Sequence, residues 1–149
     1  MTNTKALVVV SFGSTFAETR KYDIGGIEQA LADAFPSYDQ YRAFTSAIVR
    51  KRLAETGIKV NNLEETLEKL YQAGYEEILL QTTHLLHGEE FEQKVLTLQE
   101  KYSNCFKKLI IGKPLINEEN DYRLVATALS TQFPNLKEKE GVVLMGHGS

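Results

Sequence analysis

The chain has 149 residues, 42% of them hydrophobic and 25% charged, which is the size and composition of one globular domain with its own core. Three prolines and ten glycines exclude a fibrous or Pro/Gly-rich disordered protein, and a net charge of −3 argues against a general nucleic-acid binder. The lone Cys105 and the lack of an apolar run of about 18 residues predict a cytoplasmic protein without disulfides or membrane spans.

Short apolar runs alternate with segments of helical periodicity along the chain. Near-continuous apolar character predicts five buried strands, at residues 6–12, 38–44, 78–83, 109–112 and 142–145. Apolar residues spaced as on one helix face predict helices at residues 24–35, 63–70, 91–102 and 122–133, with a weaker helix at 46–55. This alternation predicts a doubly wound α/β domain built on a parallel sheet.

Polar residues before the expected helices predict how these helices begin. Thr15 with Glu18 has the spacing of a capping box for the first helix, and Asn62 with Glu65 has the same spacing for a later one. Asn117 is expected to open the last helix.

Candidate ligand-binding residues follow the strands, because open parallel sheets bind ligands beyond the carboxyl ends of their strands. After the first strand, the small residues 11–15 lead into a helix whose N-terminus could hold an anion, although Thr15 could simply cap that helix. Arg42 and Arg50 flank the end of the second strand and could receive an anionic ligand. Their neighbours Lys51 and Arg52 fit better on a solvated helix face.

Two histidine-containing segments follow the third and fifth strands. His84 and His87 lie beside Glu89 and Glu90, a set of donors that suits a divalent metal, although the two carboxylates also suit the first turn of a helix. His147 stands between two glycines, where few neighbours can pack against it, and this favours an imidazole presented to a ligand.

Six segments occur in an order that resembles one enzyme family, the anaerobic cobalt chelatases that insert Co²⁺ into sirohydrochlorin during cobalamin synthesis. They are Ser11-Phe12-Gly13-Ser14, residues 42–46 (RAFTS), 84–92 (HLLHGEEFE), 112–115 (GKPL), 120–122 (NDY) and 142–148 (VVLMGHG). The similarity extends over the whole chain.

The resemblance implies a class II, ATP-independent chelatase with a flavodoxin-like three-layer sandwich. The family has two similar α/β halves with a cleft between them. We therefore expect residues 1–139 to form an N-terminal chelatase-like domain. Residues 140–149 would be the first strand and histidine loop of a truncated second half.

The resemblance also implies roles for individual residues. His147 would bind the metal and act as a base, and Glu90 would be the acidic residue of the active site. The candidates for substrate binding are Ser11, Phe12, Gly13, Ser14, Arg42, Thr45 and His84. Co²⁺ would be a substrate and the tetrapyrrole its partner, with no nucleotide, nucleic acid or membrane involved.

Several alternatives stay open at this point. The isolated chain is expected to be weakly active or inactive, because the family's second metal-binding histidine would lie beyond Ser149. A small homodimeric chelatase and a flavodoxin-like module binding FMN through residues 11–15 are the rivals. A histidine phosphatase would carry arginine where Gly146 precedes His147. The roles of His84 and His87, and a preference for Co²⁺, Fe²⁺ or Ni²⁺, are undetermined, since imidazole and carboxylate bind all three metals.

Overall fold

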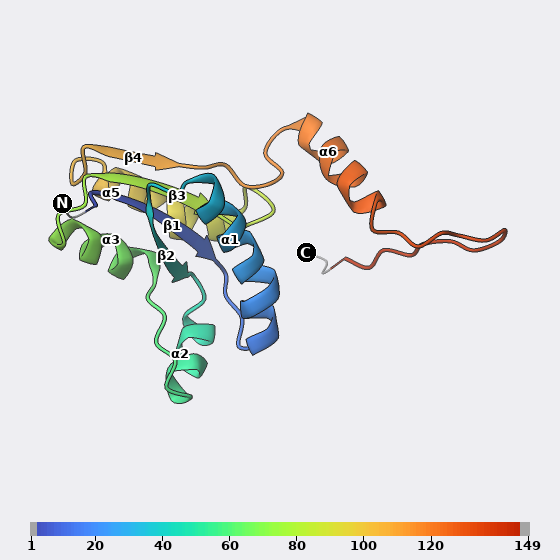
Figure 1. Cartoon of the computed structure of the whole chain (residues 1–149), viewed down its shortest axis with the longest axis horizontal. Coiled ribbons are helices and arrows are strands. Elements are labelled where there is room, and N and C mark those ends of the chain that lie inside the picture. The colour runs from blue at the N-terminus through green and yellow to red at the C-terminus, as the bar shows by residue number, and fades with distance from the viewer. Residues whose placement is uncertain (1–2, 147–149) are drawn as a thin grey trace. The chain divides into compact units, whose positions relative to one another are not determined.

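A four-stranded parallel sheet forms the centre of the molecule. The computed structural model describes residues 3–146, and its strands run in the same direction in the order β2-β1-β3-β4 (Figure 1). The strands are β1 (Lys5–Ser11), β2 (Asp39–Phe44), β3 (Glu77–Thr82) and β4 (Lys108–Ile111). These bounds confirm the first four predicted strands and the doubly wound α/β fold.

Helices follow each strand, as the apolar periodicity predicts. They are η1 (Thr19–Ile24), α1 (Gly25–Ala34), α2 (Ala47–Glu55), α3 (Leu63–Gln72), α4 (Glu89–Phe91), η2 (Glu92–Leu96), α5 (Thr97–Tyr102) and α6 (Glu119–Ser130). The segments η1 and η2 are π-helical turns within longer helices. Such turns insert an extra residue into a helix and are often found near functional sites.

The two faces of the sheet pack against different helices. Side chains alternate across a strand, so Val8 and Val10 of β1 lie in one core with Leu67 of α3 and Val95 of η2. On the opposite face Arg42, which is paired in register with Val9, bonds to Glu28 of α1. The result is a three-layer arrangement of helix, sheet and helices.

One predicted capping box is present and another is not. Asn62 and Glu65 exchange the two hydrogen bonds expected at the start of α3. The first helical segment begins at residue 17, and the Phe16 N–H donates to Ser14 Oγ at 3.1 Å, so the predicted Thr15 box is wrong. Ser14 lies closer to the strand and already supplies a hydroxyl acceptor to this turn.

The start of the last helix also differs from the prediction. Glu118, rather than Asn117, is the N-cap of α6, and it forms a capping box with Asp121. Glutamate is an unusual cap, but its carboxylate accepts a backbone N–H as Asn and Asp side chains do.

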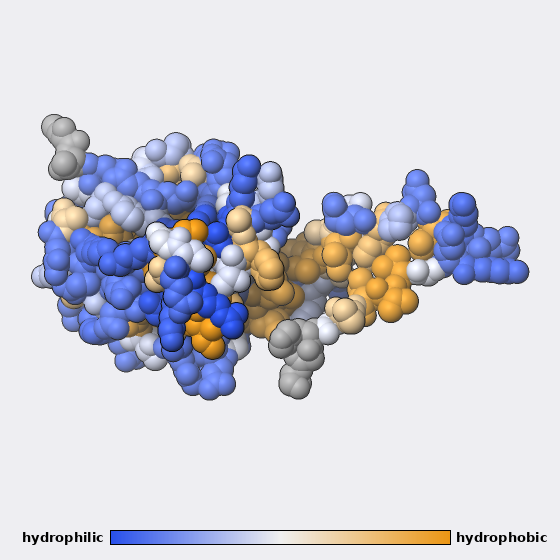
Figure 2. Space-filling model, turned by 90° about the horizontal axis from the view of Figure 1, so that it is seen from below, coloured by the Kyte–Doolittle hydropathy of each residue, from blue (hydrophilic) through white to orange (hydrophobic). Residues whose placement is uncertain are grey.

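The chain forms two compact units, the first ending at Asn117 and the second beginning at Glu118. Within the second unit α6 has no buried side chain, and its Leu124 and Leu129 are exposed, as are the apolar residues 142–145. Figure 2 shows apolar surface on one side of the molecule. Residues 142–145 form no strand here, so that prediction is wrong for this structure; no described strand pairs with them, and a strand needs such a partner for its backbone. The predicted domain boundary at 139/140 stays a prediction.

None of the helices between residues 3 and 146 combines the length and apolar character needed to cross a membrane.

Candidate functional site

Three of the sequence-predicted residues meet at the carboxyl edge of the sheet. Ser11 is the last residue of β1, Thr45 directly follows β2, and His84 comes two residues after β3. The Thr45 N–H donates to the Ser11 carbonyl at 2.9 Å, and the Thr83 N–H donates to the Val10 carbonyl at 2.8 Å. The segments that follow β2 and β3 are therefore bonded to the last two residues of β1 at this edge.

The same three residues carry buried polar atoms that lack hydrogen bonds. Ser11 Oγ, Thr45 Oγ1 and His84 Nε2 have no partner, and Ser11 and Thr45 are only 2% and 7% exposed. A buried polar atom without a partner destabilises the folded state by about 1–3 kcal/mol. Such atoms are rare in folded proteins and call for an explanation. Their concentration at the edge where parallel sheets bind ligands marks this edge as the candidate site.

The imidazole of His84 is held by Thr82, a residue that sequence reasoning missed. His84 Nδ1 shares a hydrogen bond with Thr82 Oγ1, and the His84 N–H donates to the same oxygen at 3.1 Å. Burial lowers the pKa of His84, and the negative charge of Glu90 opposes this shift. The imidazole is therefore neutral at pH 7, with Nε2 as the ring nitrogen that has no partner.

Glu90 lies in the helix that follows this loop, and His87 lies in the loop just before that helix begins at Glu89. Glu90 is the second residue of α4 and partly buried, near enough to His84 to influence its charge. His87 Nε2 instead lies 3.2 Å from Glu92 Oε1, and its ring stands edge-on to Phe91 with centroids 5.1 Å apart. These contacts connect the loop residue His87 to the helical residues Phe91 of α4 and Glu92 of η2.

The loop of residues 11–14 is closely fitted to the end of β2. Gly13 has a φ of +97°, and a Cβ atom placed on it would lie 2.6 Å from Cδ2 of Phe44. Only glycine fits this backbone conformation and this close approach. Phe12 is 54% exposed on the outside of the loop. Arg20 of η1 donates from Nη1 to the Ser14 carbonyl at 3.0 Å.

Arg42, predicted to bind substrate, forms a paired ion contact within the protein. Its Nε and Nη2 donate to Oε1 and Oε2 of Glu28 at 2.7 and 2.5 Å, and this hydrogen bonding raises the pKa of Arg42. The pairing weighs against Arg42 as a receptor for external carboxylates. Sequence reasoning missed Glu28, because nothing in a helical pattern shows which charged residue will face an arginine on a distant strand.

The other basic residues after β2 are Arg50, Lys51 and Arg52, and they differ in exposure as the sequence suggests. Lys51 and Arg52 are exposed on α2. Arg50 is partly buried, its Nη1 lies 3.9 Å from Glu65 Oε2, and its Nε has no hydrogen-bond partner. A separation of 3.9 Å is too long for a hydrogen bond.

Within residues 3–146, no three His, Cys, Asp or Glu side chains come close enough together to hold a metal ion. The predicted metal ligand, His147, lies outside the described residues. The structure therefore leaves the roles of His147 and Glu90 untested.

Comparisons with known proteins point to one family. The family model described as cobalt chelatase (CbiK) matches residues 5–149. The sirohydrochlorin cobaltochelatase of Salmonella typhimurium is 39% identical over 146 residues, which are 97% of this chain and 55% of that protein. The sirohydrochlorin cobaltochelatase CbiKC of Nitratidesulfovibrio vulgaris is 28% identical over 147 residues, which are 97% of this chain and 52% of that protein. The chain thus spans about half the length of these relatives, and by the family match it belongs to the cobalt chelatase (CbiK) family.

Proposed function

We propose that this chain supplies the N-terminal half of a sirohydrochlorin cobaltochelatase, an ATP-independent enzyme that inserts Co²⁺ into sirohydrochlorin. The observation that carries the proposal is the family match over residues 5–149, together with 39% identity to a relative of that name. The three unpaired buried polar atoms at the carboxyl edge support the location of the site.

The chemistry of insertion fits the candidate residues. The metal must lose water, reach the macrocycle and replace two pyrrole protons. In the proposal the neutral imidazole of His147 binds Co²⁺ and accepts a proton. Glu90 orients that imidazole or takes the proton onward.

The carboxyl edge of the sheet would form one wall of the substrate cleft. The loop of residues 11–14 and the unpaired atoms of Ser11, Thr45 and His84 would contact the tetrapyrrole there. A hydroxyl can donate to a carboxylate, and the free ring nitrogen of a neutral imidazole can donate or accept, depending on its tautomer. The macrocycle would thus complete hydrogen bonds that the chain leaves unmade.

A spectrophotometric assay with sirohydrochlorin and Co²⁺ tests the proposal on two proteins. One is the 149-residue chain, and the other is the chain joined to the C-terminal half of the Salmonella typhimurium relative. Because the relatives are about twice as long, we expect rapid insertion by the fusion and slow insertion by the chain alone. His147→Ala should abolish insertion by the fusion, and His87→Ala is the matched histidine control.

The outcomes separate the alternatives. A folded fusion that fails to insert Co²⁺ would show the proposal to be wrong. Rapid insertion by the chain alone, lost in His147→Ala, would favour a small homodimeric enzyme, and gel filtration would then show a dimer. A purified chain that is yellow from bound flavin would favour the FMN-binding alternative. Assays with Fe²⁺ and Ni²⁺ would establish the metal preference. A cytoplasmic location remains a prediction.

A further inference from the structure

The loop of residues 11–14 is bonded to the segment that leaves β2. The carbonyls of Ser11 and Phe12 accept the backbone N–H groups of Thr45 and Ser46 at 2.9 and 3.2 Å. These bonds fix the loop along its backbone, and they depend on where the end of β2 lies.

Gly13 rests directly on the ring of Phe44, the last residue of β2. The ring is fully buried, and a Cβ on Gly13 would approach its Cγ and Cδ2 to 2.7 and 2.6 Å. With so little space between them, the position of the ring determines the path of the loop.

An ion pair supports the Phe44 ring in turn. The guanidinium carbon of Arg42 lies 5.7 Å from the ring centroid, within the range of a cation–π contact. Glu28 of α1 holds that guanidinium with two hydrogen bonds, and Glu28 itself is only 9% exposed. Such a bidentate pair fixes the orientation of the planar guanidinium as well as its position.

We propose that Glu28 and Arg42 are positioning residues for the loop of residues 11–14, acting through the Phe44 ring. A continuous set of contacts links Glu28 to Arg42, Phe44 and Gly13. If the loop lines the cleft for sirohydrochlorin, which rests on the proposed function, loosening this pair would weaken binding of that substrate.

The proposal differs from a direct role of Arg42 in binding carboxylates. If Arg42 bound the substrate itself, neutralising Glu28 would leave the positive charge of Arg42 without its counter-ion. Binding of the polyanionic tetrapyrrole would then become tighter. If the pair positions the loop, neutralising Glu28 would weaken binding, and so would Arg42→Lys, which keeps the charge but loses the fork of two donors.

A tryptophan reporter tests the positioning role without any substrate. The chain has no tryptophan, and Phe12 is 54% exposed in the loop, so Phe12→Trp gives a single local probe. In this background we expect Glu28→Gln and Arg42→Lys to raise the acrylamide quenching constant roughly twofold, since a loop without its support opens more often. Asp33→Asn is the matched control, because Asp33 lies on the same helix and accepts a hydrogen bond from Gln29 one turn away; it should leave quenching unchanged.

Thermal unfolding followed by circular dichroism accompanies each variant. If Glu28→Gln fails to fold, Arg42→Lys still tests the proposal. Phe44→Leu should also raise the quenching constant, while the ion pair between Glu28 and Arg42 stays in place. Quenching in folded Glu28→Gln and Arg42→Lys that equals quenching in Asp33→Asn would overturn the proposal.

Titration of the chain with sirohydrochlorin, with Phe12 restored, adds the functional readout. Glu28→Gln and Arg42→Lys should each weaken binding roughly threefold to tenfold, the size expected for a bidentate support that is lost. Tighter binding by Glu28→Gln would overturn the proposal in favour of direct binding by Arg42. Absence of binding by every variant, with quenching still raised, would count against the proposed function and leave the positioning role supported.

Discussion

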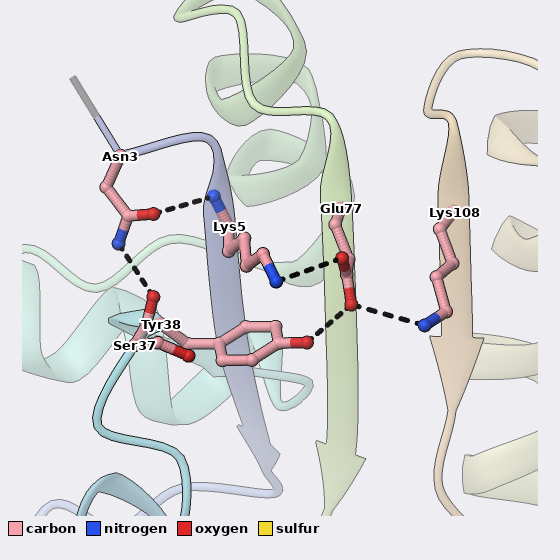
Figure 3. A network of polar contacts seen from close by, with 6 residues as sticks. All are labelled: Asn3, Lys5, Ser37, Tyr38, Glu77 and Lys108. Carbon is pink, nitrogen blue, oxygen red and sulfur yellow. Dashed lines mark hydrogen bonds and ion pairs between the residues drawn. The ribbon is translucent and has the colours of Figure 1, made fainter. Parts of the chain in front are cut away.

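The two ends of the sheet differ in whether their polar side chains have hydrogen-bond partners. At the amino end, the Glu77 carboxylate accepts a hydrogen bond from Tyr38 Oη at 2.5 Å (Figure 3). The Nζ atoms of Lys108 and Lys5 lie 3.3 and 3.6 Å from its two oxygens. Beside it, Tyr75 Oη donates to Asp39 at 2.6 Å. Polar groups at this end meet partners within the chain.

At the carboxyl end, three buried polar atoms have no partner in the described structure. They belong to Ser11, Thr45 and His84. A buried donor or acceptor without a partner destabilises the fold. The unpaired atoms at the carboxyl end and the completed hydrogen-bond network at the amino end therefore indicate different roles for the two ends. The amino end stabilises the fold, and in the proposed function the unpaired groups at the carboxyl end would bond to the tetrapyrrole.

The largest expected effect comes from filling the space at Gly13. Gly13→Ala should destabilise the chain by about 2–4 kcal/mol, because alanine is strained at φ +97° and its Cβ would overlap the Phe44 ring. Gly57→Ala is the matched control, since φ is +83° there but no atom lies within 4 Å of the added Cβ. Urea unfolding measures both. Equal losses would mean that backbone strain alone, and not the fit of the loop against Phe44, makes Gly13 necessary.

Removing one hydroxyl from each end tests the comparison directly. Tyr75→Phe removes bonds to Asp39 and Tyr41 and should destabilise the chain by about 1 kcal/mol. Thr45→Val removes a buried hydroxyl that has no partner, and should leave stability unchanged or raise it by up to about 1 kcal/mol. Urea unfolding of both variants at pH 7 measures the difference. A comparable loss in Thr45→Val would show that its hydroxyl is satisfied within the protein.

Acid should weaken the amino-end network. The hydrogen bond from Tyr38 lowers the pKa of Glu77, so the stabilisation is complete above the ordinary value of 4.5 and is lost as pH falls through the lowered pKa. Tyr38→Phe should therefore be less stable than the parent at pH 7, and the difference should shrink on acidification toward pH 3. Unfolding curves at both pH values check this, and a constant difference would contradict it.

The smallest effect concerns His84 at the other end. Burial lowers its pKa, so the folded chain binds fewer protons than the unfolded chain, and stability should fall as pH drops below the ordinary value of 6.5. His84→Gln should reduce the loss of stability between pH 7.5 and 5.5. Thermal unfolding across this range measures the slope, and identical slopes for the parent and His84→Gln would show that His84 is not the group responsible.

Local sequence patterns predicted most of the elements. The apolar runs located β1 to β4 because buried parallel strands need apolar side chains on both faces. The pattern also placed Asn62 and Glu65 correctly, since a capping box depends on residues three apart in the chain. It misplaced the cap at Thr15, where Ser14 one residue earlier bonds the turn instead.

For the candidate site, the sequence alone determined which residues follow the strands, and hence that Ser11, Thr45 and His84 gather at one edge. Only the tertiary structure decided what each of them contacts. Arg42 stands within the same motif as Thr45, yet it faces Glu28 on the other side of the sheet. Alternation along a strand sends neighbouring side chains to opposite faces, and the element packed against each face decides the partner. That choice depends on residues far apart in the chain, which no local pattern records.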